Sequence, residues 1–270
     1  MSNGTSGPLD FGELVNFYEQ VVDPLTLPIG LSALDFINIA SGYTLIDAGA
    51  GTGALAMRAA ERGARVLATD IEPKMVERAA ERLRQHATSE ARVEDFNSLQ
   101  VPDASFDAAV SIVGVLAFEG GETGLRELVR VVRPGGRIAV ATWDQEENKA
   151  PHYLASEVYR DLFPNRQLWP EGFFPSWTKV AASAALLQAG CGRAEVHDFK
   201  GEWEVTSPRT VMDDSGSSIR MFPGYKALSD WERAEFENAF VAALTKYTGS
   251  DGVARVATRA FIAVGHLPVS

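Results

Sequence analysis

The sequence predicts an α/β protein in which a mostly parallel sheet is covered by helices on both faces. From residue 43 onward, short apolar runs alternate with amphipathic helical patterns. The fourth run is apolar on both sides, as expected of a strand buried on both faces. The 270 residues are enough for one large domain with a sizeable core. Strands that alternate with helices are typical of this architecture.

The first part of the alternation runs from residue 43 to residue 95. Gly63 is placed to end the first helix, and Pro73 suits the first turn of the second. The apolar residues of that second helix, from Met75 to Leu83, recur on one face. The expected elements are a buried strand over 43–49, a helix over 54–63, a strand over 64–70, a helix over 73–83 and a third strand over 91–95.

The second part continues the same alternation. A fourth strand is expected over 106–115, and the RPGG stretch at 133–136 reads as a turn before the fifth strand. The remaining elements are a helix over 121–132, the fifth strand over 137–143, a helix over 177–191, a sixth strand over 193–199, a helix over 230–247 and a last strand over 253–265.

Three segments interrupt the alternation: residues 8–42, 144–177 and 200 to about 228. Ligands in open α/β sheets bind beyond the carboxyl ends of the strands, and the second and third segments follow such ends. They are therefore placed to roof a pocket, although ordinary surface packing remains open. The predicted organisation is a tail and helical lid over 1–42, a core over 43–143, 178–199 and 250–270, and inserted caps over 144–177 and 200–249.

Composition narrows the function classes. The net charge of −11 and pI near 4.9 argue against a general nucleic-acid binder, which needs a basic face. No run of about 18 apolar residues and no secretory signal are present, so no membrane partner is expected and the location is expected to be cytoplasmic. The single cysteine, Cys191, excludes an internal disulfide and a cysteine-rich metal site, and no metal is expected. The expected assembly is a monomer or homodimer.

The stretch LIDAGAGTG, residues 45–53, is the strongest local signal. Three glycines alternate behind an apolar run, which indicates close approach of a ligand to the backbone. With Ala54 in its last place the stretch also matches the dinucleotide fingerprint. A glycine turn without a ligand is also possible, because such turns are common.

Asp70 narrows the choice of ligand. It ends the second strand, 19 residues after Gly51, where a carboxylate can accept hydrogen bonds from both hydroxyls of a ribose. Both NAD and S-adenosylmethionine offer that ribose. Asp47, just before the turn, suits a ligand with an ammonium and a sulfonium better than one with two phosphates.

The sequence resembles the class I S-adenosylmethionine-dependent methyltransferases of the small-molecule type. LIDAGAGTG and VLATDIEPKM are similar to their first and second motifs. Residues 93–115 resemble the run from their third strand to their fourth, and 127–143 resemble the helix, turn and fifth strand that follow. The resemblance implies a Rossmann-like sheet of seven strands with an antiparallel last strand, and S-adenosylmethionine as the cofactor.

The resemblance also implies roles for residues of the cofactor site. Asp70 would hold the ribose, Ile71 would lie against the adenine, and Asp95 would read its amino group beside Phe96. Ser111 and Ile112 would contact the methionine amine through their backbone, and Asp47 would act through water or the loop amides. The glycines would let the methionine part lie on the backbone. The expected cofactor-binding residues are Asp47, Gly49, Ala50, Gly51, Gly53, Asp70, Ile71, Asp95, Phe96, Ser111 and Ile112.

Candidates for the acceptor side come from the lid and caps. His152 follows the fifth strand and is a candidate general base, with a surface histidine as the alternative. Tyr18 could fold over the cofactor. Aromatic and methionine side chains suit a planar apolar acceptor, although they could equally form the core of the cap. The substrate candidates are Trp169, Phe173, Phe174, Met212, Met221 and Phe222.

These observations favour an enzyme that transfers a methyl group from S-adenosylmethionine to oxygen, nitrogen or carbon of a small, aromatic or apolar metabolite, with a place in secondary metabolism. An NAD-dependent oxidoreductase that uses residues 49–54 is the first alternative. A protein that binds S-adenosylmethionine without catalysis is the second.

Overall fold

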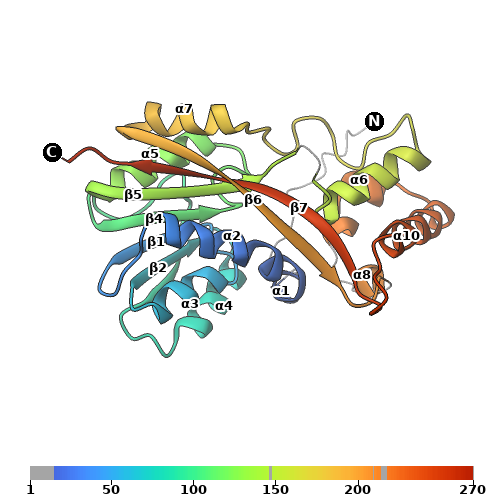
Figure 1. The fold of residues 1–270 in the computed structure, drawn as a ribbon, viewed down its shortest axis with the longest axis horizontal. Coiled ribbons are helices and arrows are strands. Elements are labelled where there is room, and N and C mark those ends of the chain that lie inside the picture. The colour runs from blue at the N-terminus through green and yellow to red at the C-terminus, as the bar shows by residue number, and fades with distance from the viewer. Residues whose placement is uncertain (1–14, 146–147, 209, 214–217, 270) are drawn as a thin grey trace, which may run out of the picture.

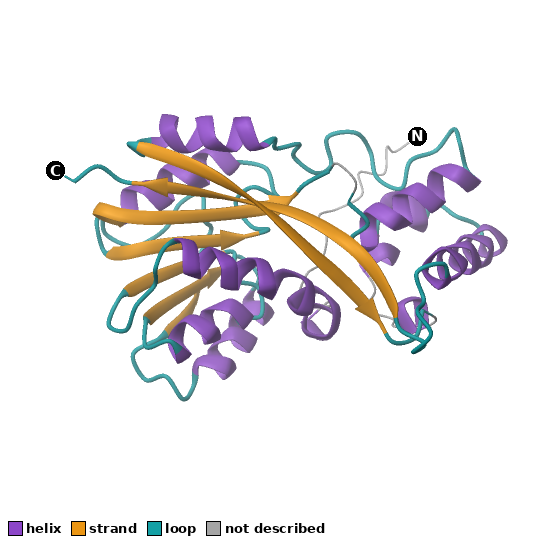
Figure 2. Ribbon diagram, viewed as in Figure 1, coloured by secondary structure: helices purple, strands orange, loops and turns teal. Residues whose placement is uncertain are grey.

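A computed structural model describes residues 15–145, 148–208, 210–213 and 218–269. It contains a seven-stranded sheet with the order β3-β2-β1-β4-β5-β7-β6 (Figures 1 and 2). Neighbouring strands from β3 to β5 are parallel, whereas β7 is antiparallel to both β5 and β6. The predicted fold class is therefore confirmed. The strands are β1 (Thr44–Ala48), β2 (Arg65–Asp70), β3 (Glu90–Val93), β4 (Phe106–Ile112), β5 (Val132–Trp143), β6 (Arg193–Val205) and β7 (Ala254–His266).

Helices cover both faces of this sheet. α2, α3 and α4 lie on one face and α5 and α7 on the other (Figure 1). The pattern of α4 explains its placement, because Met75, Val76, Ala79 and Leu83 fall on one buried stripe. The helical elements are α1 (Val15–Phe17), the π-helical turn η2 (Tyr18–Val22), α2 (Asp23–Phe36), α3 (Ala54–Glu61), α4 (Pro73–Leu83), α5 (Gly121–Val131), α6 (Pro151–Leu162), α7 (Lys179–Ala189), α8 (Thr210–Asp213), η3 (Ser218–Met221), α9 (Pro223–Lys226) and α10 (Asp230–Thr245).

The strands β6 and β7 form a ribbon that runs past the end of the sheet. They pair from Arg193 opposite His266 to Val205 opposite Ala254, whereas the pairing of β5 with β7 ends at Trp143 opposite Ala260. A hydrophobic core separate from those on the two faces of the sheet joins this free part of the ribbon to α6, α8, α9 and α10. Of these helices, α6, α8 and α10 lie beside the far end of the ribbon in Figure 1. The ribbon therefore carries a cap at the carboxyl end of the sheet.

The structure differs from the sequence prediction at several boundaries. Residues 200–205, expected to begin a cap, continue β6, because Trp203 and Val205 alternate with exposed glutamates and pair with β7. The RPGG stretch lies within β5 at a shift of register, since β5 begins at Val132. The segment 144–177 contains α6. The tail expected at the N-terminus lies outside the described residues.

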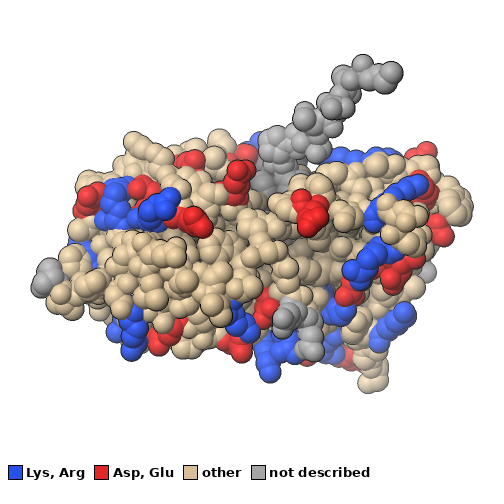
Figure 3. Space-filling model, turned by 90° about the horizontal axis from the view of Figure 1, so that it is seen from above, with Lys and Arg blue, Asp and Glu red and all other residues tan. Residues whose placement is uncertain are grey.

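No described helix is both long and apolar enough to span a bilayer. On the face shown in Figure 3, Lys and Arg side chains are interspersed with Asp and Glu side chains. This face therefore shows no continuous basic field of the kind that binds nucleic acid.

Candidate functional site

The glycine stretch forms the turn from β1 into α3. Gly49, Gly51 and Gly53 all have positive φ, at 72°, 54° and 78°, a conformation that glycine adopts at little cost. A side chain at Gly53 would meet Ala79 of α4, with its Cβ 2.7 Å from the Ala79 Cβ. Gly49 and Gly51 line a cavity at this turn, whereas Gly53 allows α3 to pack closely on α4.

Asp70 ends β2 beside this turn. Its Oδ2 accepts a hydrogen bond from the Gly51 amide at 2.9 Å, and its Oδ1 accepts one from the Glu72 amide at 3.0 Å. Burial raises the pKa of Asp70, and these two amides partly offset that effect. Each carboxylate oxygen retains a lone pair, so the oriented carboxylate can accept two further hydrogen bonds.

A cavity of about 420 Å³ opens over the turn. Most of the predicted cofactor residues line it: Gly49, Ala50, Gly51, Asp70, Ile71, Asp95, Phe96 and Ile112. Ile71 is 66% exposed, which is unusual for a large apolar side chain and suits contact with a ligand. Ser111 lies outside the lining. Its hydroxyl donates to Ala48 O and accepts from the Val115 amide, so it holds the end of β4.

Asp47 is buried behind the turn, only 2% exposed, and its Oδ2 has no hydrogen-bond partner among the described residues. Burial, with a contribution from Asp70, raises its pKa to about 7. Asp47 lines a recess of about 40 Å³ that shares residues with the larger cavity. The shared residues are Asp23, Thr26, Gly49, Ala50 and Ile112.

We predict that Asp47→Asn stabilises the ligand-free protein at pH 8. Because the folded carboxyl titrates near 7 against 3.8 unfolded, Asp47 costs no stability below pH 4 and an increasing amount as the pH rises to 7. The expected gain is about 1–3 kcal/mol at pH 8 and near zero at pH 4, measured by urea unfolding. Asp107→Asn is the control, since Thr44 and Arg133 hydrogen-bond that carboxylate, and it should lose stability. A loss of stability in Asp47→Asn at pH 8 would contradict the prediction.

Ion pairs hold the lid formed by η2 and α2 on the core. Glu19 accepts hydrogen bonds from Arg78 Nε and Arg82 Nη2, both at 2.7 Å. Asp23 pairs with Arg82 at 2.8 Å and accepts from the Thr52 hydroxyl at 2.7 Å. These contacts place Tyr18 over Gly51, where a Cβ would lie 3.8 Å from the tyrosine ring.

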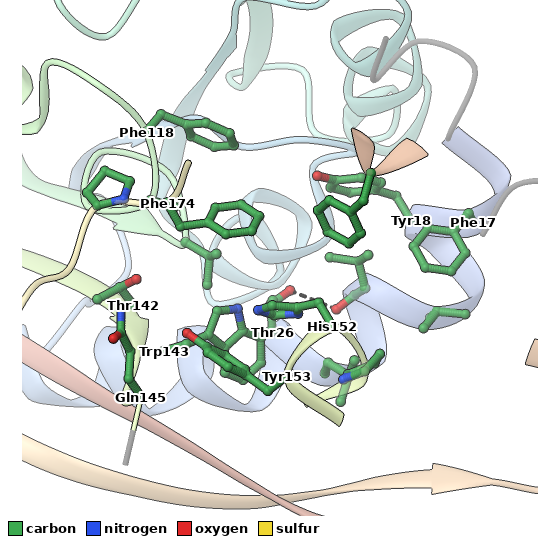
Figure 4. A pocket seen from close by; sticks show the side chains of 18 residues that line it. Phe17, Tyr18, Thr26, Phe118, Thr142, Trp143, Gln145, His152, Tyr153 and Phe174 are labelled. Atoms are coloured by element: carbon green, nitrogen blue, oxygen red, sulfur yellow. Dashed lines mark hydrogen bonds between the residues drawn. The ribbon is translucent and has the colours of Figure 1, made fainter. Parts of the chain in front are cut away.

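A second cavity, of about 140 Å³, lies between the lid, the end of β5, α6 and the cap (Figure 4). Phe17 and Tyr18 lie at one end, and Thr142 and Gln145 lie at the other (Figure 4). Its walls are mainly apolar. The lining includes Phe17, Tyr18, Val21, Leu25, Phe118, Thr142, Trp143, Gln145, His152, Tyr153, Phe174 and Phe222.

The two cavities share a wall. Both are lined by Tyr18 and Val22 of η2, Thr26 of α2, and Val113 and Phe118 beyond β4. A molecule in one cavity is therefore adjacent to a molecule in the other. Val113 has φ 54°, an outlying conformation for a β-branched residue, and such strain clusters at functional sites.

His152 and Tyr18, the two candidate catalytic residues, both line the second cavity. Burial lowers the pKa of His152 to about 4, so its imidazole is neutral at pH 7. Trp143, Tyr153 and Phe174 surround it, with the Tyr153 ring centroid 4.3 Å away. Burial, followed by the charges of Asp70 and Asp23, raises the pKa of Tyr18 and keeps its phenol protonated.

Some of the predicted substrate residues line the second cavity, whereas others pack in the core of the cap. Phe174 and Phe222 line the second cavity, whereas Trp169 and Phe173 pack against them and line a neighbouring cavity of about 320 Å³. Met212 is buried in the core of the cap and lines no cavity described here. Met221, at the end of η3, also lies outside the lining.

Sequence reasoning missed several lining residues. Asn97, Asp23 and Thr26 line the first cavity, and Trp143 and Thr142 line the second. Asn97 follows the predicted adenine residues directly, and its buried Oδ1 has no partner among the described residues. Its position next to Asp95 and Phe96 could have identified Asn97 from the sequence. Asp23 and Thr26 reach the site only because the lid packs on the core.

Comparison with known proteins identifies one segment of the chain. A family model described as a methyltransferase domain matches residues 46–140. Residues 46–140 are a methyltransferase domain. This segment carries the glycine turn, Asp70, Asp95 and the end of β4, which are the parts that form the first cavity.

The methyltransferase domain has relatives of known and unknown activity. A 2-methyl-6-phytyl-1,4-hydroquinone methyltransferase from Synechocystis sp. is 34% identical over 175 residues, which cover 64% of this chain and 53% of that protein. An uncharacterised protein of Mycobacterium bovis is 32% identical over 130 residues, which cover 48% of this chain and 47% of that protein. The chain thus spans about half the length of the curated relatives it matches.

A solved structure shares its fold with most of this chain. A methyltransferase assigned to an antibiotic biosynthesis pathway in Anabaena variabilis superposes with a TM-score of 0.65 at 19% identity, covering 88% of this chain and 96% of that one. The similarity of fold therefore extends beyond the segment that the family model matches.

Proposed function

We propose that this chain is an S-adenosylmethionine-dependent methyltransferase that acts on a small, ring-bearing molecule. The shared wall of Tyr18, Val22, Thr26, Val113 and Phe118 carries the proposal. It sets a cavity that contains the Asp70 carboxylate, placed to hold a ribose, beside an aromatic cavity, as transfer between two bound molecules requires.

The first cavity fits the cofactor. S-adenosylmethionine supplies the methyl group and carries two cationic centres, an ammonium and a sulfonium. Asp23, Asp47 and Asp70 place three carboxyl groups around the glycine turn, and Asp47 Oδ2 is unpartnered there. Ile71, exposed at the rim, and Phe96 are positioned to hold the adenine. The same acids disfavour the pyrophosphate of NAD, which argues against the oxidoreductase alternative.

The chain contributes mainly by positioning the acceptor. Holding two reactants in register supplies about 7–11 kcal/mol of barrier reduction, whereas a general base supplies about 3–5 kcal/mol. The rings around the second cavity exclude water and orient a planar molecule. A ring nitrogen of neutral His152 can accept a hydrogen bond or a proton from the acceptor, as a base of low strength.

The hydroquinone acted on by the Synechocystis relative supports an aromatic acceptor here. The apolar rings of the second cavity support the same class. We therefore propose a small-molecule partner rather than a nucleic acid.

The test uses labelled methyl transfer. With S-adenosyl-[methyl-³H]methionine and a panel of phenols, hydroquinones and amines, tritium is expected in an organic product whose mass rises by one methylene. His152→Ala should slow turnover by about 10-fold or more and leave S-adenosylhomocysteine binding unchanged. Binding of S-adenosylhomocysteine without any transfer would favour the non-catalytic alternative, and binding of NADH in its place would overturn the proposal.

A further inference from the structure

We propose that the methyl acceptor is a single-ring compound with a carboxylate-bearing side chain, and that Arg160 in an outer cavity binds that carboxylate. This inference rests on the proposed function and names the class of substrate. It comes from the size of the aromatic cavity and from the chemistry of the space that continues it.

The aromatic cavity is small. Its volume of about 140 Å³ is close to that of a cavity of roughly 150 Å³ that accommodates one benzene molecule. One ring therefore fills it. Any further atoms of the acceptor must extend out of this space, past its open end.

The outer cavity provides that space. It measures about 320 Å³, and Gln145, Tyr153 and Phe174 line it together with the aromatic cavity. The Gln145 amide donates to the Ser176 hydroxyl at 3.1 Å on this boundary. A ligand can therefore occupy both cavities at once, with its ring inside and its chain outside.

The outer cavity is more polar than the inner one, although Leu168, Trp169 and Phe173 also line it. Tyr153, Ser156 and Arg160 lie at positions i, i+3 and i+7 of α6 and so line it from one helix face. Gln167 and the loop through Phe174 form the opposite wall. Hydroxyl, amide and guanidinium groups recognise a carboxylate better than a hydrocarbon tail.

Arg160 is the cation available for a ligand. Arg166 also lines the outer cavity but is paired with Glu232 at 2.8 Å and stacks on Phe163. Arg160 has no ion pair or hydrogen bond among the described residues. Glu171 is an exposed acid in the same lining and opposes an anion there. Removing the Glu171 charge should therefore strengthen the binding of an anion, the opposite of the effect expected for Arg160.

This arrangement should favour one of two kinds of aromatic acceptor. A prenylated hydroquinone, like that of the Synechocystis relative, has no charge to pair with Arg160, and its long tail would extend past the outer cavity into water. A ring with a short acidic chain would pair its charge with Arg160, and its ring would still reach the wall shared with the cofactor cavity.

Calorimetry on the full chain saturated with S-adenosylhomocysteine tests the inference. The probes are 3-(3,4-dihydroxyphenyl)propanoate, the corresponding carboxamide, and a prenylated hydroquinone in detergent. We expect the propanoate to bind about tenfold more tightly than the amide, the size of one charge-assisted hydrogen bond at a partly exposed site. Arg160→Gln should reduce this preference to less than threefold, and Glu171→Gln should increase propanoate affinity.

Arg65→Gln is the matched control, since Arg65 is an exposed arginine at the start of β2, far from the cap in sequence and fold. It should leave the preference unchanged. Equal binding of acid and amide, tighter binding of the prenylated compound, no binding of any probe, or an unaltered preference in Arg160→Gln would each overturn the inference. Selective, Arg160-dependent binding of the acid without methyl transfer would instead contradict the proposed function alone.

Discussion

Replacing Asp70 by alanine is expected to weaken the binding of S-adenosylhomocysteine by about 10²–10³-fold. The carboxylate is fixed by the amides of Gly51 and Glu72 and is aimed into the cofactor cavity. Two hydrogen bonds to a charged acceptor contribute about 1.5–3 kcal/mol each. In the variant, water can hydrogen-bond to the ribose hydroxyls and so recover part of this free energy. Calorimetric titration gives the affinity directly.

Asp95→Ala provides the comparison for Asp70. Asp95 lines the same cavity but is exposed, and one of its oxygens already accepts the Asn97 amide at 2.8 Å. Its loss should cost about tenfold or less. Unfolding of Asp70→Ala should occur at nearly the wild-type temperature, because burial already disfavours this charge. Equal losses of affinity in the two variants would refute the assignment of Asp70 to the ribose.

Gly53→Ala should produce the largest loss of stability, about 3–5 kcal/mol. A φ of 78° costs a residue with a side chain about 1–2 kcal/mol. The new Cβ would also lie 2.7 Å from the Ala79 Cβ and 2.8 Å from the Ala79 Cα, so that α3 or α4 must shift. Urea unfolding measures the loss, and the melting temperature should fall by about 10 °C.

Gly42→Ala distinguishes the cost of a positive φ from the cost of the steric contact with Ala79. Gly42 has φ 86°, close to that of Gly53, but a Cβ there meets no atom within 4 Å. Only the conformational cost of about 1–2 kcal/mol remains. If Gly53→Ala were no worse than Gly42→Ala, contact between α3 and α4 would not be the reason for this glycine.

The sheet and the cofactor motif could be predicted because their signals are local. The apolar runs around Leu45 and Val66, the glycines between them and the acid at Asp70 lie within 26 residues. Strand period, turn chemistry and the spacing from Gly51 to Asp70 each depend on neighbouring residues. They required no knowledge of which distant segments meet.

The lid and the cap depended on distant contacts. The pairing of Arg82 with Glu19 and Asp23 joins segments about 60 residues apart, and nothing in either segment specifies the other. Residues 200–205 become strand because β7, about 50–60 residues later, pairs with them. Gly53 was expected to face a ligand, although its spacing also suited a tight contact between helices.

Because β6 and β7 extend beyond the sheet, the cap and the proposed cofactor site are built from different parts of the chain. The residues that line the proposed cofactor cavity come from the first 120 residues, whereas the helices of the cap pack on two strands that extend beyond the main sheet. We therefore expect substitutions in the cap to change the proposed acceptor site while leaving the loops of the proposed cofactor site in place.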